Sequence, residues 1–437
     1  MRRTIVDAPG PEAGTTSRAL HIVLVSFACD PTRGSEPAIG WGWAEALARR
    51  GHTVDVLTHP ESDNEQNIKQ RVAELGDVGE RIAVHLVPLP RAPSWTGLLP
   101  GCLSGMAEEV KSYDRWQRAA LTYARSHGLG RADLVHHVSY GSLQGGSALC
   151  RLGPPLVFGP VGGGQIAPHR HRRHVGTGYW QEALRSLLWV GCLSRRPSCR
   201  RTLDKAAVVL ATNRDTERLA RRLSRTPTRL VLADGIQESL VREPGEPRQD
   251  RPHRPPTVLW VGRLLPRKAP ELALRTLAQL RSDLPEARLL VFGEGPLRPA
   301  LERLAHRLGV GDCVDFRGRS PREEVFAACD DADVFLMTSM RDSFGMQALE
   351  AWARGLPVVH LGHHGISDFS APGGAVSVPL GSPADLPQRL ASALSAVIGG
   401  RHTRPCMERA ALEWARKHTW TAKAETAEEI YRDILFR

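Results

Sequence analysis

Two acidic residues, Asp342 and Glu350, frame a stretch that could bind a phosphorylated ligand. The apolar run 334–337 before them predicts a buried strand, and residues 345–355 predict a helix. In an open parallel sheet, ligands bind beyond the carboxyl ends of the strands. The start of a helix there offers free N–H groups to a phosphate, here those of Gly345, Met346 and Gln347. We therefore expect an anion site bracketed by the two carboxylates.

A second pair of charged residues follows another predicted strand. Arg263 and Lys268 come after the apolar run 257–261, at the carboxyl end of that strand. Their positive charges could stabilise a diphosphate that gains negative charge as it leaves a sugar. Because the carboxyl ends of parallel strands share one edge, we expect these two phosphate-directed features to meet.

The elements that position these residues alternate between strand and helix in two series, separated by the Pro-rich stretch 243–256. This predicts an α/β protein of two Rossmann-like, doubly wound domains that face each other across a cleft. The expected parts are a flexible tail (1–17), a first domain (18–242), a linker (243–256), a second domain (257–408) and closing helices (409–437).

The stretch 342–359 resembles the Glu-x7-Glu motif of family 4 retaining glycosyltransferases, the glycosyl transferases group 1 of GT-B fold. Asp342 stands where the family has Glu. The matching positions are Phe344, Gly345, Glu350, Ala351, Ala353, Gly355, Pro357, Val358 and Val359. The family's Gly-Arg-Leu-x-x-x-Lys-Gly is matched at Gly262, Arg263, Leu264 and Lys268, with Ala269 in place of the last Gly.

This resemblance implies transfer of a sugar from a nucleoside diphosphate to an acceptor hydroxyl with retention of configuration, without a metal ion or other cofactor. The implied catalytic residues are Arg263, Lys268, Asp342 and His137. The implied donor-binding residues are Gly34, Gly262, Gly293, Gly295, Arg317, Phe344, Gly345, Met346, Gln347 and Glu350. Glu350 would hold the ribose and Asp342 the sugar hydroxyls. In such folds the closing helix crosses back to the first domain.

Acceptor contacts are expected from the first domain. Glu36 follows a glycine-containing loop, where it would either bind acceptor or act as a dipole partner at a helix start. His137 ends a predicted strand, and both a site role and a structural role are open for it and for His136. Consecutive glycines indicate close approach to a ligand or to the facing domain, and these are Gly162, Gly163 and Gly164.

Composition limits the other classes of protein. The chain has 437 residues, a formal charge of +11 and only 5% aromatic residues, which does not favour nucleic-acid binding. Its eight cysteines lack metal spacing. The tail has no apolar run of a signal peptide and no segment is long and apolar enough to span a membrane, so we expect a cytoplasmic protein. A sugar-nucleotide epimerase or a phosphorylase on the same fold remains an alternative.

One helical stretch has an apolar stripe beside basic residues. Trp180, Leu184 and Leu187 recur at helical spacing near Arg185, and four more arginines follow between 195 and 201. Such a helix either faces a core or lies on an anionic membrane. Because donor and acceptor are expected on different domains, we also expect the cleft to close around a hinge formed by the 243–256 linker and the returning C-terminal helix.

Overall fold

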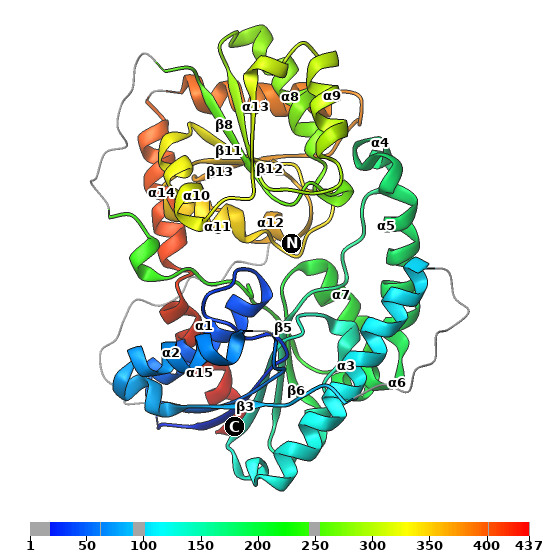
Figure 1. Ribbon diagram of the computed structural model, residues 1–437, viewed down its shortest axis with the longest axis vertical. Coiled ribbons are helices and arrows are strands. Elements are labelled where there is room, and N and C mark those ends of the chain that lie inside the picture. Colours follow the sequence, from blue (N-terminus) through cyan, green and yellow to red (C-terminus); the bar gives the residue numbers. More distant parts are fainter. Residues whose placement is uncertain (1–17, 62, 91–100, 244–253, 401, 437) are drawn as a thin grey trace, which may run out of the picture.

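The computed structural model describes residues 18–61, 63–90, 101–243, 254–400 and 402–436. Two α/β lobes follow one another along the long axis of the molecule (Figure 1). The first contains a seven-stranded sheet and the second a six-stranded sheet. The expected tail, 1–17, lies outside the described residues.

All strand pairs in both sheets are parallel. The first sheet has the order β3-β2-β1-β4-β5-β6-β7 and the second has β10-β9-β8-β11-β12-β13, so each is doubly wound as expected. The strands are β1 (His21–Ser26), β2 (Thr53–Thr58), β3 (Ile82–Leu86), β4 (Leu134–Ser139), β5 (Leu156–Val161), β6 (Ala206–Ala211), β7 (Thr228–Leu230), β8 (Thr257–Val261), β9 (Arg288–Phe292), β10 (Val314–Gly318), β11 (Val334–Met337), β12 (Val358–Leu361) and β13 (Ala375–Val378).

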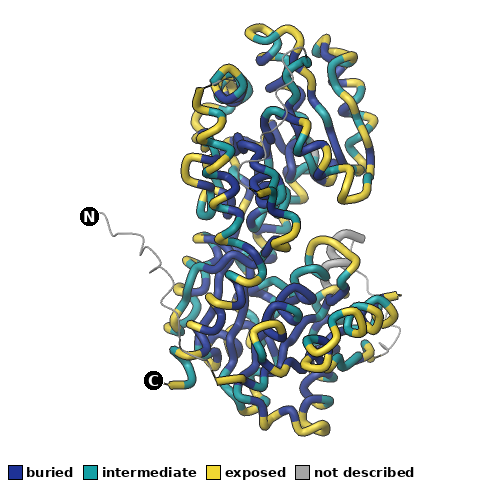
Figure 2. Tube along the Cα trace, turned by 90° about the vertical axis from the view of Figure 1, so that its left-hand side faces the viewer, coloured by how far each residue is buried: buried dark blue, intermediate teal, exposed yellow. Residues whose placement is uncertain are grey.

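Helices cover both faces of each sheet, which is why the central strands are continuous apolar runs. Buried segments gather inside each lobe in Figure 2. The helices are α1 (Glu36–Arg49), α2 (Asn64–Glu74), α3 (Gly101–Ser126), α4 (Arg172–Val175), α5 (Tyr179–Ser186), α6 (Pro197–Lys205), α7 (Arg214–Leu223), α8 (Pro270–Asp283), α9 (Arg298–Arg307), α10 (Arg322–Asp331), α11 (Met346–Ala353), α12 (His364–Asp368), α13 (Leu386–Gly399), α14 (Arg404–Arg416) and α15 (Trp420–Leu435).

The chain crosses between the domains earlier than the sequence predicted. Ile236 and Val241 already belong to an apolar core of the second domain. The Arg242 N–H donates to the carbonyl of Ala353 in that domain at 2.9 Å. The first domain therefore ends before Ile236 rather than at 242. Residues 244–253 of the expected linker lie outside the described residues, and their flanks both belong to the second domain.

The return crossing lies beside the first one. The Ile236 N–H donates to His418 O and the Trp420 N–H donates to Ile236 O, each at 3.0 Å. Helix α14 packs on α11 of the second domain, whereas α15 packs on α1 of the first. The expected closing unit 409–437 is thus divided, and α15 alone crosses back (Figure 1).

A segment of the first domain also reaches across to the second. His171 and His174 contact the carbonyl oxygens of Leu380 and Pro383 through Nε2, at 3.1 and 2.9 Å. Tyr179, at the start of α5, is buried in a core of the second domain. In Figure 1, α4 lies level with the second domain and α5 lies below it, towards the first domain. Helix α5 therefore connects the two domains on the side away from α14.

Candidate active site

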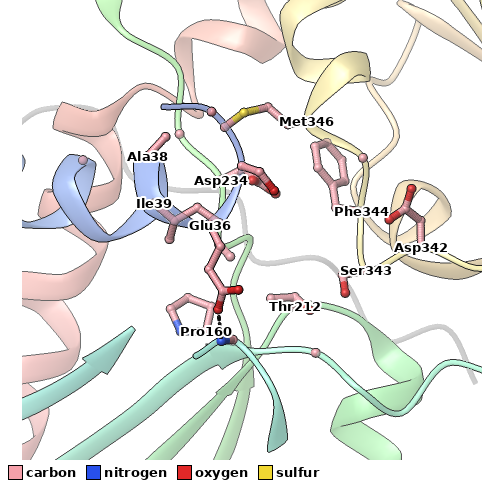
Figure 3. A pocket seen from close by; sticks show the side chains of 18 of the residues that line it. Glu36, Ala38, Ile39, Pro160, Thr212, Asp234, Asp342, Ser343, Phe344 and Met346 are labelled. Carbon is pink, nitrogen blue, oxygen red and sulfur yellow. Dashed lines mark hydrogen bonds between the residues drawn. The ribbon is translucent and has the colours of Figure 1, made fainter. Parts of the chain in front are cut away.

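A cleft of about 1310 Å³ lies between the domains and is lined by both. Figure 3 shows Glu36, Pro160 and Thr212 on the first-domain side and Asp342, Ser343 and Phe344 on the opposite side. The second-domain residues come from the loops at the carboxyl ends of its parallel strands. The expected site residues Gly34, Arg263 and Lys268 also line this cleft, together with Gly345, Met346, Gln347 and Glu350.

The start of helix α11 faces this cleft. Gly345 precedes the helix with φ of 109°, a backbone conformation that residues with a side chain rarely adopt, so this turn favours glycine. Phe344 is 2% exposed and packs against Trp352 and Phe369, which anchors the turn. The fixed turn presents the first N–H groups of α11 to the cleft, as an anion site requires.

Asp342 pairs with two cations of the loop after β8. It contacts Lys268 Nζ, and its Oδ1 lies 3.6 Å from Arg267 Nη1. Burial alone would raise the pKa of Asp342, but the charges of Lys268 and Arg267 outweigh it and lower the pKa. The residue before α11 is Gly345, without a side-chain cap, so Asp342 does not cap this helix.

Lys268 is fixed through its backbone. Its carbonyl accepts a bond from Thr338 Oγ1 at 2.9 Å, and Thr338 in turn accepts one from Trp260 Nε1 at 3.0 Å. Strands β8 and β11 are neighbours, so the two phosphate-directed features meet at one edge as predicted. Arg263 is exposed and lines the cleft nearby.

Glu350 lies further along α11 and faces Arg322 of α10. Its Oε1 is 3.0 Å from Arg322 Nη2. Burial raises the pKa of Glu350, and the charge of Arg322 offsets this in part. A carboxylate with one hydrogen-bonded oxygen can still accept bonds from ligand hydroxyls at the cleft.

Glu36 is the first residue of α1 and points into the cleft (Figure 3). It accepts hydrogen bonds from the Gly141 N–H at 2.6 Å and from Ser139 Oγ at 3.1 Å. Burial raises its pKa although these two bonds lower it. Glu36 therefore combines both expected positions, at a helix start and in the cleft.

The three consecutive glycines permit close packing, partly against the facing domain. A Cβ at Gly162 would lie 2.6 Å from Ser343 Oγ, and one at Gly164 would lie 2.6 Å from the backbone of Asp215. Gly163 has φ of 109° and packs on Gln144. Gly162 and Gly163 line the cleft, whereas Gly164 is not part of its lining.

His137 does not face the cleft. It is fully buried beneath it, 3.3 Å from the Tyr113 hydroxyl and beside the Phe158 ring. Burial lowers its pKa to about 3. His136 is equally buried and contacts Gly159 O and the Tyr431 hydroxyl. Neither histidine is among the residues that line the cleft.

Four expected donor residues lie outside the cleft lining. A Cβ at Gly293 or Gly295 would collide with the backbone of residues 262–264, so these glycines allow two loops to pack. Gly262 belongs to that packed loop. Arg317 is exposed and pairs with Asp315 at 2.7 Å.

Several further charged residues of the cleft were not predicted as site residues, among them Glu182, Arg185, Asp234 and Arg267. Arg267 adjoins Lys268, which could have suggested it. Asp234 lies on the crossing segment, and burial raises its pKa to about 6 although Lys423 opposes this. Glu182 and Arg185 line the cleft because α5 reaches the second domain, for which the sequence gives no signal.

Neither a metal-binding cluster nor a membrane-spanning helix is found among the described residues. No group of three or more His, Cys, Asp or Glu side chains is arranged there to hold a metal ion. Among the helices described, none has both the length and the apolar character needed to cross a membrane.

Known proteins resemble this chain along most of its length. Residues 242–404 match the family Glycosyl transferases group 1, and residues 34–235 match the Glycosyl transferase 4-like domain. The D-inositol 3-phosphate glycosyltransferase of Corynebacterium diphtheriae is 29% identical, with 95% of each chain covered. The D-inositol 3-phosphate glycosyltransferase of Corynebacterium aurimucosum is 28% identical over 55% of this chain. The chain spans only 60% of that relative's length.

Solved structures share the fold. A sucrose-phosphate synthase from Thermosynechococcus elongatus has a TM-score of 0.64 at 20% identity, covering 95% of this chain and 99% of the other. Anabaena HepE in complex with UDP has a TM-score of 0.61 at 17% identity, covering 95% and 100%. Two parallel-sheet domains around such a cleft define the GT-B class of fold. Within that class, the chain belongs to the glycosyl transferases group 1 of family 4.

Proposed function

We propose that this chain transfers a sugar from a nucleoside diphosphate donor to an acceptor hydroxyl with retention of configuration. The observation that supports this most is the meeting of Lys268, Arg267 and Asp342 beside the start of α11. A diphosphate placed there would meet both fixed cations and free N–H groups. Uridine is the first donor nucleoside to test, because Anabaena HepE binds UDP and, in another complex, UDP-glucose.

The proposed reaction needs charge stabilisation more than a nucleophile. The acceptor oxygen forms the new bond to the sugar on the face from which the diphosphate departs, and a diphosphate oxygen takes the acceptor's proton. Lys268, Arg263 and the α11 amides stabilise the negative charge that develops on the leaving group. Asp342 holds a sugar hydroxyl and Glu350 the ribose. No step requires a cofactor beyond the donor itself.

A donor panel tests this function. Purified protein is incubated with UDP-, GDP- and ADP-sugars and a mixture of polyol and sugar-phosphate acceptors, and release of the nucleoside diphosphate is measured. Acceptor-dependent release from one donor, with a product of the donor's own anomeric configuration, is the expected result. Interconversion of the free donor sugar would instead support an epimerase, which the family membership does not favour.

We further propose that the enzyme acts in the cytoplasm against an anionic membrane surface. Three apolar side chains on α5 and the helical turn that follows it are exposed: Trp180 at 70%, Leu187 at 64% and Leu184 at 41%. They occupy the side of the helix opposite to its cleft-lining residues. Exposed aromatic and aliphatic side chains beside arginines are typical of helices that lie on lipid.

A further inference from the structure

Helix α5 and the turn after it present one face to the cleft. Glu182, Arg185 and Ser186 line the cleft, followed by Trp189 and Val190 on the π-helical turn Leu187–Cys192. These residues are three or four positions apart, so they share one side of the helix. The face contains two charged groups, and they differ in their surroundings.

Glu182 already has a partner. Its carboxylate accepts two bonds from Arg341 of the second domain, at 2.5 and 3.2 Å. Arg185 has none: within the described part of the chain, no carboxylate lies within ion-pair distance of its guanidinium. Burial lowers the pKa of Arg185, and the positive charge of Arg341 lowers it further, although Glu182 and Tyr140 act in the opposite direction. A half-buried cation beside another positive charge is stabilised when an anion binds to it.

Arg185 is also held in position. Its guanidinium lies 5.1 Å from the centre of the Trp189 ring. Trp189 is 5% exposed, and its indole N–H donates to Ser142 Oγ at 3.2 Å. Ser142 lies just beyond β4, bridged to Gly162. The cation is therefore fixed by the first domain, whereas the groups proposed for the donor diphosphate belong to the second.

We infer that Arg185 is a specificity residue that binds an anionic group, most simply a phosphate, on the acceptor. This inference rests on the proposed function, because it assigns the donor diphosphate to the second domain. A cleft of about 1310 Å³ has room for both molecules. The phosphate belongs either to a soluble polyol phosphate or to a lipid headgroup, and the chemistry of recognition is the same for both.

Calorimetric titrations of the full chain test the inference. Three ligands are titrated: UDP, inorganic phosphate and inositol 3-phosphate. Each is titrated into wild type, Arg185→Gln, Arg185→Lys and Arg200→Gln. The two phosphate compounds are titrated both with and without saturating UDP. Arg200 is an exposed arginine of the same domain outside the cleft, so Arg200→Gln controls for net charge. Cosedimentation of the same variants with phosphatidylinositol vesicles distinguishes a lipid phosphate from a soluble one. Melting temperatures confirm that each variant folds.

Arg185→Gln should weaken binding of the phosphate compound about 10- to 100-fold, leave UDP affinity within about two-fold, and be partly rescued by Arg185→Lys. In the calorimetric titrations, Arg200→Gln should match wild type. The inference is overturned if no phosphate compound binds wild type, or if Arg185→Gln weakens UDP instead. Failure of UDP to bind wild type would contradict the proposed donor, while the phosphate titrations without UDP would still report on Arg185.

Discussion

Asp342 contacts Lys268 in the structure, and this contact allows a more specific prediction of what the loss of the Asp342 carboxylate should do. A carboxylate beside Lys268 competes with a diphosphate for the same charge. Asp342→Asn should therefore leave UDP affinity unchanged or slightly higher. It should lower kcat by roughly ten- to 150-fold, because a charged hydrogen bond to the sugar contributes about 1.5 to 3 kcal/mol.

Steady-state transfer rates and calorimetric UDP titrations measure the two effects separately. Asp312→Asn, an acid outside the cleft, is the matched control. An unchanged kcat in Asp342→Asn would remove Asp342 from the reaction.

Among single residues, the cleft lining includes those predicted from a motif at a helix start, such as Phe344 and Gly345, but not His137, which was predicted from the end of a strand. The position of Phe344 and Gly345 follows from the turn that Gly345 permits. His137 could not be placed in this way, since alternate strand residues normally point to opposite faces and the sequence does not show which face is covered. Here both faces are covered: α15 brings Tyr431 to His136, and α3 brings Tyr113 to His137.

The return of helix α15 is secured by an ion pair that should depend on pH. Glu428 accepts bonds from Arg50 of α1 at 2.8 and 3.0 Å and lies 3.2 Å from His52 Nε2. Burial would raise the pKa of Glu428, but these partners lower it from 4.5 to about 2. A carboxyl group with a depressed folded-state pKa stabilises the fold above its unfolded pKa and loses this effect as the pH falls.

Glu428→Gln should therefore lower the free energy of unfolding at pH 7 by about 1.5 to 3 kcal/mol. The difference from wild type should shrink as the pH falls from about 4.5 towards 2. Urea unfolding at several pH values measures it, and Glu425→Gln, at a more exposed carboxylate that also contacts Arg50, is a suitable control. A difference independent of pH would contradict this account.

Helix α5 shows both the strength and the limit of reading elements from sequence. Its apolar stripe was found, but helical spacing alone cannot say whether a stripe faces a core, a membrane or a cleft. In the structure, the residues of this stripe have different surroundings. Ala183 packs on the second domain, while Trp180, Leu184 and Leu187 are exposed. Strands β7 and β13 were missed for a related reason, since short edge strands of mixed polarity lack a periodic signal.

If the outer face of α5 meets lipid, its apolar residues should be needed for membrane binding and not for UDP binding. Replacing Trp180 and Leu187 together by Ser should reduce cosedimentation with anionic vesicles several-fold at low salt, because the buried apolar area is lost. Phe436→Ser, which alters an equally exposed apolar residue at the end of the chain, controls for general hydrophobicity. Absence of wild-type binding to such vesicles would refute a lipid role.

At the scale of the whole molecule, the two domains were predictable as separate units but their contacts were not. Strand and helix alternation follows from local sequence, whereas the crossing at 231–236 depends on which core buries Ile236 and Val241. The cleft is also bridged by polar contacts between distant residues. Gln165 Nε2 donates to Ser343 Oγ at 2.8 Å, and Asn213 Nδ2 donates to the Ser343 carbonyl at 3.1 Å.

These contacts suggest a closed form that the donor should favour, with the paired crossings at Ile236 and His418 as the hinge. Small-angle scattering should show a smaller radius of gyration with UDP than without. Gly162→Val should prevent this compaction, because even a Cβ there lies 2.6 Å from Ser343 Oγ. Gly399→Ala, at an open surface position, should behave as wild type. An identical radius with and without UDP in wild type would argue against closure.

The central claim is that the cleft binds a nucleoside diphosphate through the second domain, with Glu350 on the ribose. Calorimetric titration of UDP into wild type and Glu350→Ala tests it most directly. Glu350 would grip a part of the donor that does not change during transfer, so Glu350→Ala should weaken UDP at least about ten-fold and raise the donor KM in proportion, with kcat little changed. The claim would be contradicted if neither UDP nor another nucleoside diphosphate bound wild type, or if UDP bound Glu350→Ala as tightly as it binds wild type.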